Sequence, residues 1–226
     1  MLEDKLSTNI RVLIVDDHAL VREALSERLQ REPGITVVGT AGTADEAIEK
    51  ANACNPNVIL MDIDMPGLIC FDAAKTIASL RPDAHIIFLS AFTHDGYIEQ
   101  ALEVEARGYL TKREPPDRVV EAIREVASGG AYFSNEVRSR IVVHPRGAKL
   151  DEDRRQSRAS LLTQREVQIV QYIARGLSKK EIAATMHLAV KTVDRHCANL
   201  MTKLDIHDRV GLTRFAIREG LAGVDA

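Results

Sequence analysis

Three carboxylates follow two apolar runs in the first half of the chain, at positions where they can meet. The run 11–15 ends in Asp16 and Asp17, and the run 58–61 ends in Asp62. Such runs are typical of buried parallel strands, and ligands bind at the edge where parallel strands end. Carboxylates gathered at that edge predict a site for a hard divalent cation. A cation there could bring a phosphoryl group to an aspartate.

The elements that must position these carboxylates alternate along the first half of the chain. Apolar runs predict strands, helical patterns lie between them, and a capping box at 43–46 opens one helix. This alternation predicts an α/β fold, a doubly wound five-stranded parallel sheet with helices on both faces. The expected strands are 11–15, 35–38, 58–61, 86–89 and 108–111, and the expected helices are 19–31, 43–54, 70–80, 94–106 and 115–128.

The last part of the chain predicts helices only, as a small all-α domain. Capping boxes at 163–166 and 178–181 open two short helices, which we expect to end near Gly176 and Met186. A longer helix is expected at about 190–204, and a last helix at about 208–219. Short capped helices joined by a turn of a few residues indicate a helix-turn-helix.

A charged segment separates the two parts. Residues 135–143 predict a short helix, and residues 144–160 predict an exposed linker because they hold almost no large apolar side chains. The expected organisation is therefore a domain over 9–130, a linker with a short helix over 131–160, and the helix-turn-helix domain over 161–226.

Charge is distributed unequally between the two parts. Residues 1–135 hold 13 Lys and Arg against 22 Asp and Glu, a net charge of −9, whereas residues 136–226 hold 17 against 11, a net charge of +6. This asymmetry favours contact between the second part and a polyanion. No apolar stretch suits a membrane span, and the N-terminus is unlike a signal peptide. The three cysteines show no metal-binding spacing, so we expect reduced, structural thiols and a cytoplasmic protein with no membrane partner.

The first domain resembles a two-component receiver domain. The resemblance lies in Asp16-Asp17, Asp62 with Met65-Pro66-Gly67, Ser90-Ala91 and Gly108-Tyr109-Leu110-Thr111-Lys112, in family order at the ends of four expected strands. Each residue alone has an ordinary structural explanation, such as acids at a helix N-terminus or a solvated lysine. The ordered set favours the receiver.

The resemblance implies that Asp62 is the phosphoacceptor. It would receive the phosphoryl group from a sensor histidine kinase, with Mg²⁺ as cofactor. Asp17, Asp62 and the backbone carbonyl of Asp64 would bind the ion, with Asp16 close by or acting through water.

The resemblance also implies roles for residues of the later strands. Lys112 would neutralise phosphoryl oxygens, Ser90 would donate a hydrogen bond to the phosphoryl group, and Tyr109 would rotate inward as part of the switch. Two positions depart from the family pattern: Ile69-Cys70 stands where Asp-Gly is common, and Glu105 stands where glycine would relieve a left-handed backbone.

Residues 161–221 resemble the LuxR-type helix-turn-helix output domain, and a receiver joined to this module is typical of NarL/FixJ-class response regulators. The matching stretches are Leu162-Thr-Gln-Arg-Glu166, Gly176-Leu-Ser-Lys-Lys-Glu-Ile-Ala183, Lys191-Thr-Val-Asp-Arg-His196 and Lys203-Leu204.

One helix of this module carries two distinct faces. Val193, Cys197, Leu200 and Leu204 step by four, three and four residues, which predicts a buried face. The exposed face would read DNA, where Arg suits guanine and Asn suits adenine, unless it is simply solvated. The expected DNA contacts are Lys179, Lys180, Lys191, Thr192, Asp194, Arg195, Asn199 and Lys203, with Lys179, Lys180 and Lys203 on phosphates.

Two departures affect this module. Asp194 stands where a lysine is frequent, and its carboxylate could accept a hydrogen bond from cytosine or simply repel phosphate. Ala189 replaces the usual serine cap of the recognition helix, a loss worth about 1 kcal/mol.

The sequence therefore predicts a non-enzymatic, phosphorylation-dependent transcription regulator. Phosphorylation would switch dimerisation and the binding of double-stranded DNA, at inverted-repeat sites that suit a twofold homodimer. The resemblance implies that the helix at 208–219 dimerises on DNA, although its apolar side chains could simply pack within the domain. Two alternatives remain: a receiver that acts through protein-protein signalling, and a haloacid-dehalogenase-like phosphatase, suggested by Asp62-Ile-Asp64.

Overall fold

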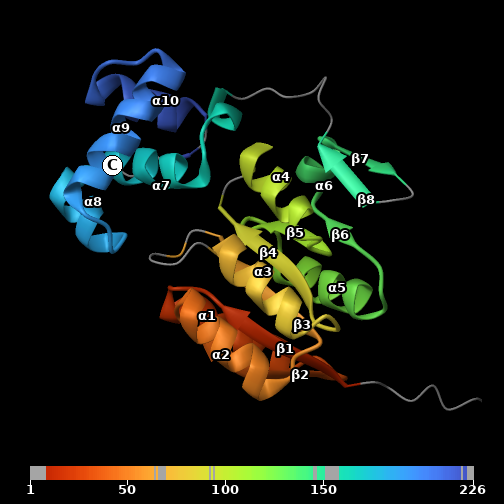
Figure 1. Ribbon diagram of the computed structural model, residues 1–226. Helices are drawn as coiled ribbons and strands as arrows, with labels where there is room; N and C mark the ends of the chain where they lie inside the picture. The colour runs from red at the N-terminus through yellow and green to blue at the C-terminus, as the bar shows by residue number, and fades with distance from the viewer. Residues whose placement is uncertain are drawn as a thin grey trace, which may run out of the picture. The chain divides into compact units, whose positions relative to one another are not determined.

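The computed structural model describes residues 9–63, 65, 70–91, 93, 95–144, 147–150, 158–219 and 221–222. Asp64, Pro66, Gly67 and Ile69 of the first domain, and residues 151–157 of the expected linker, lie outside the described residues. The chain forms two compact units (Figure 1). One comprises residues 1–91 and 104–134, and the other comprises residues 92–103 and 135–226.

The first unit is built on a parallel sheet with strand order β2-β1-β3-β4-β5-β6. The five expected strands are present, and a sixth, which we did not predict, pairs with β5. A two-residue strand has no detectable alternation, so sequence reasoning missed it. The strands are β1 (Ile10–Val15), β2 (Ile35–Ala41), β3 (Val58–Asp62), β4 (His85–Ser90), β5 (Gly108–Thr111) and β6 (Tyr132–Phe133).

Helices cover both faces of this sheet because side chains alternate along each strand. Val12, Ile14 and Leu60 belong to a core that includes side chains of α1 and α5. On the other face, Phe71 of α3 contacts Phe88 of β4, with ring centroids 4.8 Å apart. The helices of this unit are α1 (Ala19–Gln30), α2 (Ala44–Cys54), α3 (Cys70–Leu80) and α5 (Pro116–Ala127).

The segment after the sheet is more ordered than its composition predicts. The expected helix at 135–143 ends early, as α6 (Asn135–Arg138), and β7 (Ile141–His144) follows it. β7 pairs antiparallel with β8 (Gly147–Leu150), so residues 147–150 of the segment that we expected to be a linker form a strand. The β-branched run Ile141-Val142-Val143 suits such a pairing.

The second unit contains the helix-turn-helix. Its elements are η2 (Arg158–Leu161), α7 (Gln164–Ala174), α8 (Lys179–Thr185), α9 (Val190–Leu204) and α10 (Arg209–Arg218). The two capping boxes predicted in this unit are present, at Thr163 with Glu166 and at Ser178 with Glu181. The box predicted at 43–46 is formed only in half: the Thr43 hydroxyl accepts from the Glu46 amide, but the Glu46 carboxylate accepts from the Gly42 amide in place of the Thr43 amide. The fourth helix of the α/β pattern, α4 (Asp95–Glu103), belongs to this unit by its contacts, which include β8 and η2. Among the described residues, no helix is long and apolar enough to cross a membrane.

Candidate functional site

The predicted carboxylates meet at the ends of β1 and β3. Asp62 is the last residue of β3, and Asp16 and Asp17 follow β1 directly. Because β1 and β3 are neighbouring parallel strands, their carboxyl ends lie side by side. Asp16 and Asp62 are fully buried, whereas the Asp17 side chain is 26 % exposed. One ligand atom from each of these residues and from His18 lies within 4.8 Å of the others, so the cluster can hold a cation.

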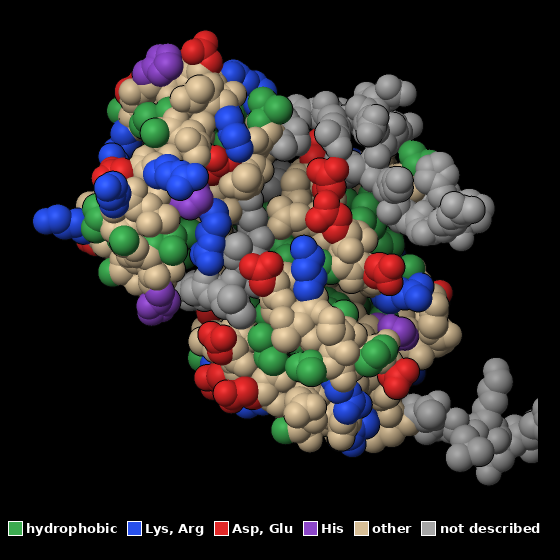
Figure 2. All heavy atoms as spheres, viewed as in Figure 1, with side chains coloured by type: hydrophobic (Ala, Val, Ile, Leu, Met, Phe, Trp, Pro, Cys, Tyr) green, Lys and Arg blue, Asp and Glu red, His purple; other side chains and the backbone are tan. Residues whose placement is uncertain are grey.

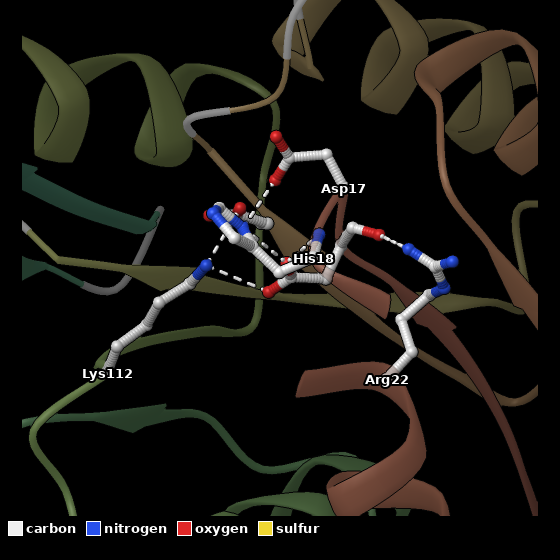
Figure 3. A network of polar contacts seen from close by, with 6 residues as sticks. Asp17, His18, Arg22 and Lys112 are labelled. Atoms are coloured by element: carbon white, nitrogen blue, oxygen red, sulfur yellow. Dashed lines mark hydrogen bonds and ion pairs between the residues drawn. The ribbon is translucent and has the colours of Figure 1, made fainter. Parts of the chain in front are cut away.

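Lys112, which follows β5, supplies a positive charge to this cluster (Figure 3). Its Nζ lies 2.8 Å from Asp62 Oδ2 and 2.8 Å from Asp16 Oδ2. Burial lowers the pKa of Lys112, but the neighbouring carboxylates of Asp62 and Asp16 outweigh this effect and raise the pKa above its usual value. Lys112 is therefore a cation held between the two most buried carboxylates of the site.

Two residues at this edge were not predicted from the sequence. His18 Nδ1 lies 2.7 Å from Asp17 Oδ1 and 3.2 Å from Asp16 Oδ1, and Arg22 donates to the Asp16 carbonyl (Figure 3). The sequence could have indicated His18, because it directly follows the Asp pair and an imidazole beside carboxylates can bind the same cation. Arg22 is one helical turn further on, where only the fold shows that its guanidinium points back.

The predicted switch residues lie on β4, which neighbours β3, and on β5, the next strand of the sheet. Ser90 ends β4 and Tyr109 is in β5, and both side chains are fully buried. Tyr109 thus already lies inward in this structure. Asp64, whose carbonyl we expect to bind the cation, is outside the described residues.

The recognition helix α9 has the two predicted faces. Val193, Cys197, Leu200 and Leu204 are buried. Lys191, Asp194, Arg195 and Asn199 are exposed, and Thr192 is half-buried. Figure 2 shows Lys and Arg side chains over the region of α8 and α9. The exposed face thus carries two cations, Lys191 and Arg195, one carboxylate, Asp194, and the polar Asn199.

Two of the predicted DNA-contacting lysines form ion pairs inside the second unit. Lys203 Nζ lies 2.7 Å from Oε2 of the buried Glu166, and Lys179 Nζ lies 2.6 Å from Asp194 Oδ1. Lys180 and Lys191 are exposed and have no ion pair with another described residue. The lysines therefore differ in how freely their charge can meet a phosphate.

A buried hydrogen bond joins α4 to α7 in the same unit. The Tyr97 hydroxyl donates to Gln171 Oε1 at 3.3 Å, and both side chains are buried. At the start of α4, the Arg140 guanidinium lies 3.4 Å from the buried Asp95 carboxylate. Sequence reasoning missed Tyr97, because a tyrosine on an amphipathic helix gives no sign of a partner 74 residues away.

Comparison with known proteins agrees with this geometry. Residues 12–124 match the family described as response regulator receiver domain, and residues 160–216 match bacterial regulatory proteins, luxR family. Response regulator UvrY of Escherichia coli O157:H7 is 35 % identical over 216 residues, covering 96 % of this chain and 97 % of UvrY. Transcriptional regulatory protein MctR of Rhizobium johnstonii is 37 % identical over 212 residues, covering 94 % and 95 %.

Solved structures share the fold. The RcsB response regulator of Salmonella typhimurium aligns with a TM-score of 0.71 at 20 % identity, over 94 % of this chain and 98 % of RcsB. RcsB has also been solved bound to a promoter in the presence of a phosphomimetic. These matches give no support to the phosphatase alternative. The chain belongs to the NarL/FixJ class of response regulators, transcription regulators that join a receiver domain to a LuxR-type DNA-binding domain.

Proposed function

We propose that phosphorylation of Asp62 by a sensor histidine kinase controls DNA binding by this regulator in the cytoplasm. The observation that supports this proposal best is the juxtaposition of Asp62, Asp16 and Lys112 at one sheet edge. A carboxylate oxygen of Asp62 would attack phosphorus as the bond to the donor histidine breaks, which leaves an acyl phosphate on the protein.

The cation that fits this site is Mg²⁺. Its donors are all oxygens apart from the imidazole of His18, and carboxylate oxygens are the ligands that Mg²⁺ prefers. Asp17, Asp62 and the backbone carbonyl of Asp64 would hold the ion, with Asp16 close by or acting through water. Mg²⁺ would supply positive charge that offsets the charge of the phosphoryl oxygens.

Three protein groups complete the proposed reaction and switch. Lys112 would exchange its contact with the Asp62 carboxylate for one with a phosphoryl oxygen, since it is already adjacent. The Ser90 hydroxyl would donate a hydrogen bond to the phosphoryl group. The buried Tyr109 side chain would change its position when Asp62 is phosphorylated. Ser90 is buried at the end of β4, which neighbours β3, and Tyr109 is buried in β5, the next strand, which supports these roles.

A rearrangement at Ser90 has a short route along the chain to α4, which begins five residues later. Tyr97 of α4 is hydrogen-bonded to Gln171 of α7, the helix that packs against α9 and α10. We propose that this contact restrains the DNA-binding helices, and that phosphorylation releases or reorients them. An equilibrium between two arrangements would then be biased by one local charge event.

The proposed DNA interface is the exposed face of α8 and α9. Arg195 and Asn199 would contact base edges, while lysines such as Lys180 would contact phosphates. A homodimer would read an inverted repeat. Val210 and Ile217 of α10 are 61 % and 39 % exposed, which leaves part of this helix available for a dimer contact. The full set of proposed DNA contacts is Lys179, Lys180, Lys191, Thr192, Asp194, Arg195, Asn199 and Lys203.

Selection of genomic DNA fragments tests the proposal. Purified protein and Asp62→Asn would be treated identically with acetyl phosphate and Mg²⁺, and the bound fragments sequenced. Enrichment of an inverted repeat by the modifiable protein alone would support phosphorylation control. Equal enrichment by both proteins would leave DNA binding in place but remove Asp62 phosphorylation as its control.

A further inference from the structure

The ion pair between Lys179 and Asp194 joins the two helices of the helix-turn-helix. Lys179 is the first residue of α8, and Asp194 lies in the first half of α9. Their charged atoms are 2.6 Å apart, and the two side chains are 53 % and 49 % exposed. The pair therefore lies on the surface of the unit, where solvent or a ligand can reach it.

Asp194 is not held by the core of the domain. The buried face of α9 is formed by Val193, Cys197, Leu200 and Leu204, and Asp194 points away from it. Lys179 binds Oδ1, and no other described residue donates a hydrogen bond to either carboxylate oxygen. A carboxylate has about four acceptor sites, so Asp194 keeps acceptor capacity for a ligand.

The charge of this pair argues against a phosphate contact for Asp194. A carboxylate facing the DNA backbone would be repelled, whereas Lys179 neutralises Asp194 and makes the pair tolerable near a polyanion. Exposed residues in the N-terminal half of a recognition helix are the ones that contact base edges. Asp194 stands there between Lys191 and Arg195, both exposed.

We propose that Asp194, oriented by Lys179, is a specificity-determining residue that reads one base of each half-site. Its acceptor oxygens suit the N4 amino group of cytosine in the major groove. The same carboxylate disfavours guanine, which presents only acceptors at its major-groove edge. Asp194 would therefore both favour cytosine and reject guanine. This inference rests on the proposed DNA-reading role of α9 and adds the base class that it selects.

Selection from a randomised duplex library by the full-length protein tests the assignment, with and without acetyl phosphate and Mg²⁺. For the wild-type chain we expect cytosine at one position of each half-site, favoured about 5- to 150-fold over guanine. Asp194→Asn should shift that position alone toward adenine, since the amide suits the adenine edge. Lys179→Gln should keep the cytosine preference but weaken it, because the carboxylate loses its orienting partner.

Lys180→Gln is the matched control, since Lys180 is the exposed neighbour of Lys179 and forms no ion pair with a described residue. It should weaken binding to all DNA sequences to a similar extent. The slope of log affinity against log salt concentration should fall by about 1, the value for one phosphate contact. If Asp194→Asn and wild type select the same site, the ion pair is only structural and the inference is wrong while DNA reading stands. If the wild-type chain enriches no sequence, DNA reading by α9 fails, and this inference fails with it.

Discussion

The Lys112 ammonium lies 2.8 Å from Asp62 Oδ2, the side chain on which the proposed phosphorylation takes place. The same nitrogen lies 2.8 Å from Asp16 Oδ2. Asp62 therefore begins the proposed reaction as one member of an ion pair at the end of a buried strand. Lys112 and a divalent cation both interact with the same cluster of carboxylates, so the presence of one changes the free energy with which the other binds there.

We expect Lys112→Met to separate these two roles. Loss of the ammonium leaves the carboxylates of Asp16, Asp17 and Asp62 without this charge, so divalent-cation affinity should rise several-fold. Phosphorylation by acetyl phosphate should nevertheless slow at least ten-fold, because a charge that stabilises the phosphoryl oxygens is gone. Calorimetry gives the Mg²⁺ affinity, and phosphate-affinity gels give the rate.

Lys75→Met is the matched control for this experiment, because Lys75 is exposed on α3. It should leave both quantities unchanged. Weaker cation binding in Lys112→Met would contradict the competition between Lys112 and the cation.

Removal of one hydroxyl should loosen the restraint between α4 and α7. Tyr97→Phe deletes a buried hydrogen bond to Gln171, which is worth about 1 kcal/mol. In an Asp62→Asn background, which prevents phosphorylation, we expect DNA affinity to rise by roughly five-fold. Fluorescence anisotropy with labelled duplex measures this change.

Tyr132→Phe provides the comparison, because its hydroxyl contacts Glu121 within the first unit. Its DNA affinity should match that of the background protein. Unchanged affinity in Tyr97→Phe would show that the Tyr97–Gln171 contact does not restrain DNA binding.

Local sequence signals predicted most of the fold, because strands and helices here are marked by apolar runs and caps. Thr163 and Ser178 cap the predicted helices, and Glu105 has the expected left-handed backbone, with a φ of 55°. The parts that were missed depend on tertiary packing. The pairs Lys203–Glu166 and Tyr97–Gln171 join distant segments, so helix packing decides them and no local pattern does.

The stability of the second unit should depend on pH through Glu166. Burial raises the pKa of this carboxyl, but the hydrogen bonds from Lys203 and Thr163 outweigh burial and lower the pKa below its usual value. Because the folded pKa is depressed, the stabilisation is fully present above about pH 4.3 and is lost as pH falls through the folded pKa. Glu166→Gln keeps the capping geometry but loses the charge, so we expect a loss of about 1 kcal/mol at pH 6.

Urea titrations read from backbone NMR signals of α7 and α9 in the full chain check this prediction. The difference between wild type and Glu166→Gln should shrink as pH falls from 6 toward 3.5, a window set by the depressed pKa of Glu166. In a Lys203→Met background the difference should be smaller at every pH. A difference that stays constant over this range would contradict the role of the Glu166 charge.

Glu105 occupies a backbone conformation that favours glycine, and its side chain is exposed. A non-glycine residue at positive φ costs about 1–2 kcal/mol, whereas glycine costs about 0.5–1 kcal/mol through unfolded-chain entropy. We therefore expect Glu105→Gly to stabilise the first unit by up to about 1 kcal/mol, measured by urea unfolding. Glu105→Ala keeps the strain and should bring no gain; a loss of stability in the glycine variant would contradict this comparison.

The recognition helix lacks a side-chain cap that a single substitution can restore. Ala189 has extended backbone angles at the N-cap of α9 and makes no side-chain hydrogen bond, whereas Ser178 caps α8 through its hydroxyl. The Thr192 amide already donates to the Ala189 carbonyl, so the hydroxyl of Ala189→Ser should accept from the Lys191 amide and stabilise the first turn by about 1 kcal/mol. Hydrogen exchange of the first amides of α9 should then slow roughly five-fold in the full chain, without DNA.

The same substitution tests whether DNA binding depends on the order of α9. If the first turn is ordered only when DNA binds, the added cap removes part of that ordering cost and affinity should rise together with amide protection. If the turn is already ordered by Val193 and its buried neighbours, protection should rise while affinity stays constant. Ala53→Ser adds the same hydroxyl to the exposed surface of α2, away from the proposed DNA interface, where serine is a slightly poorer helix former, so neither quantity should increase. Equal protection in Ala189→Ser and wild type would show that the missing cap does not limit this helix.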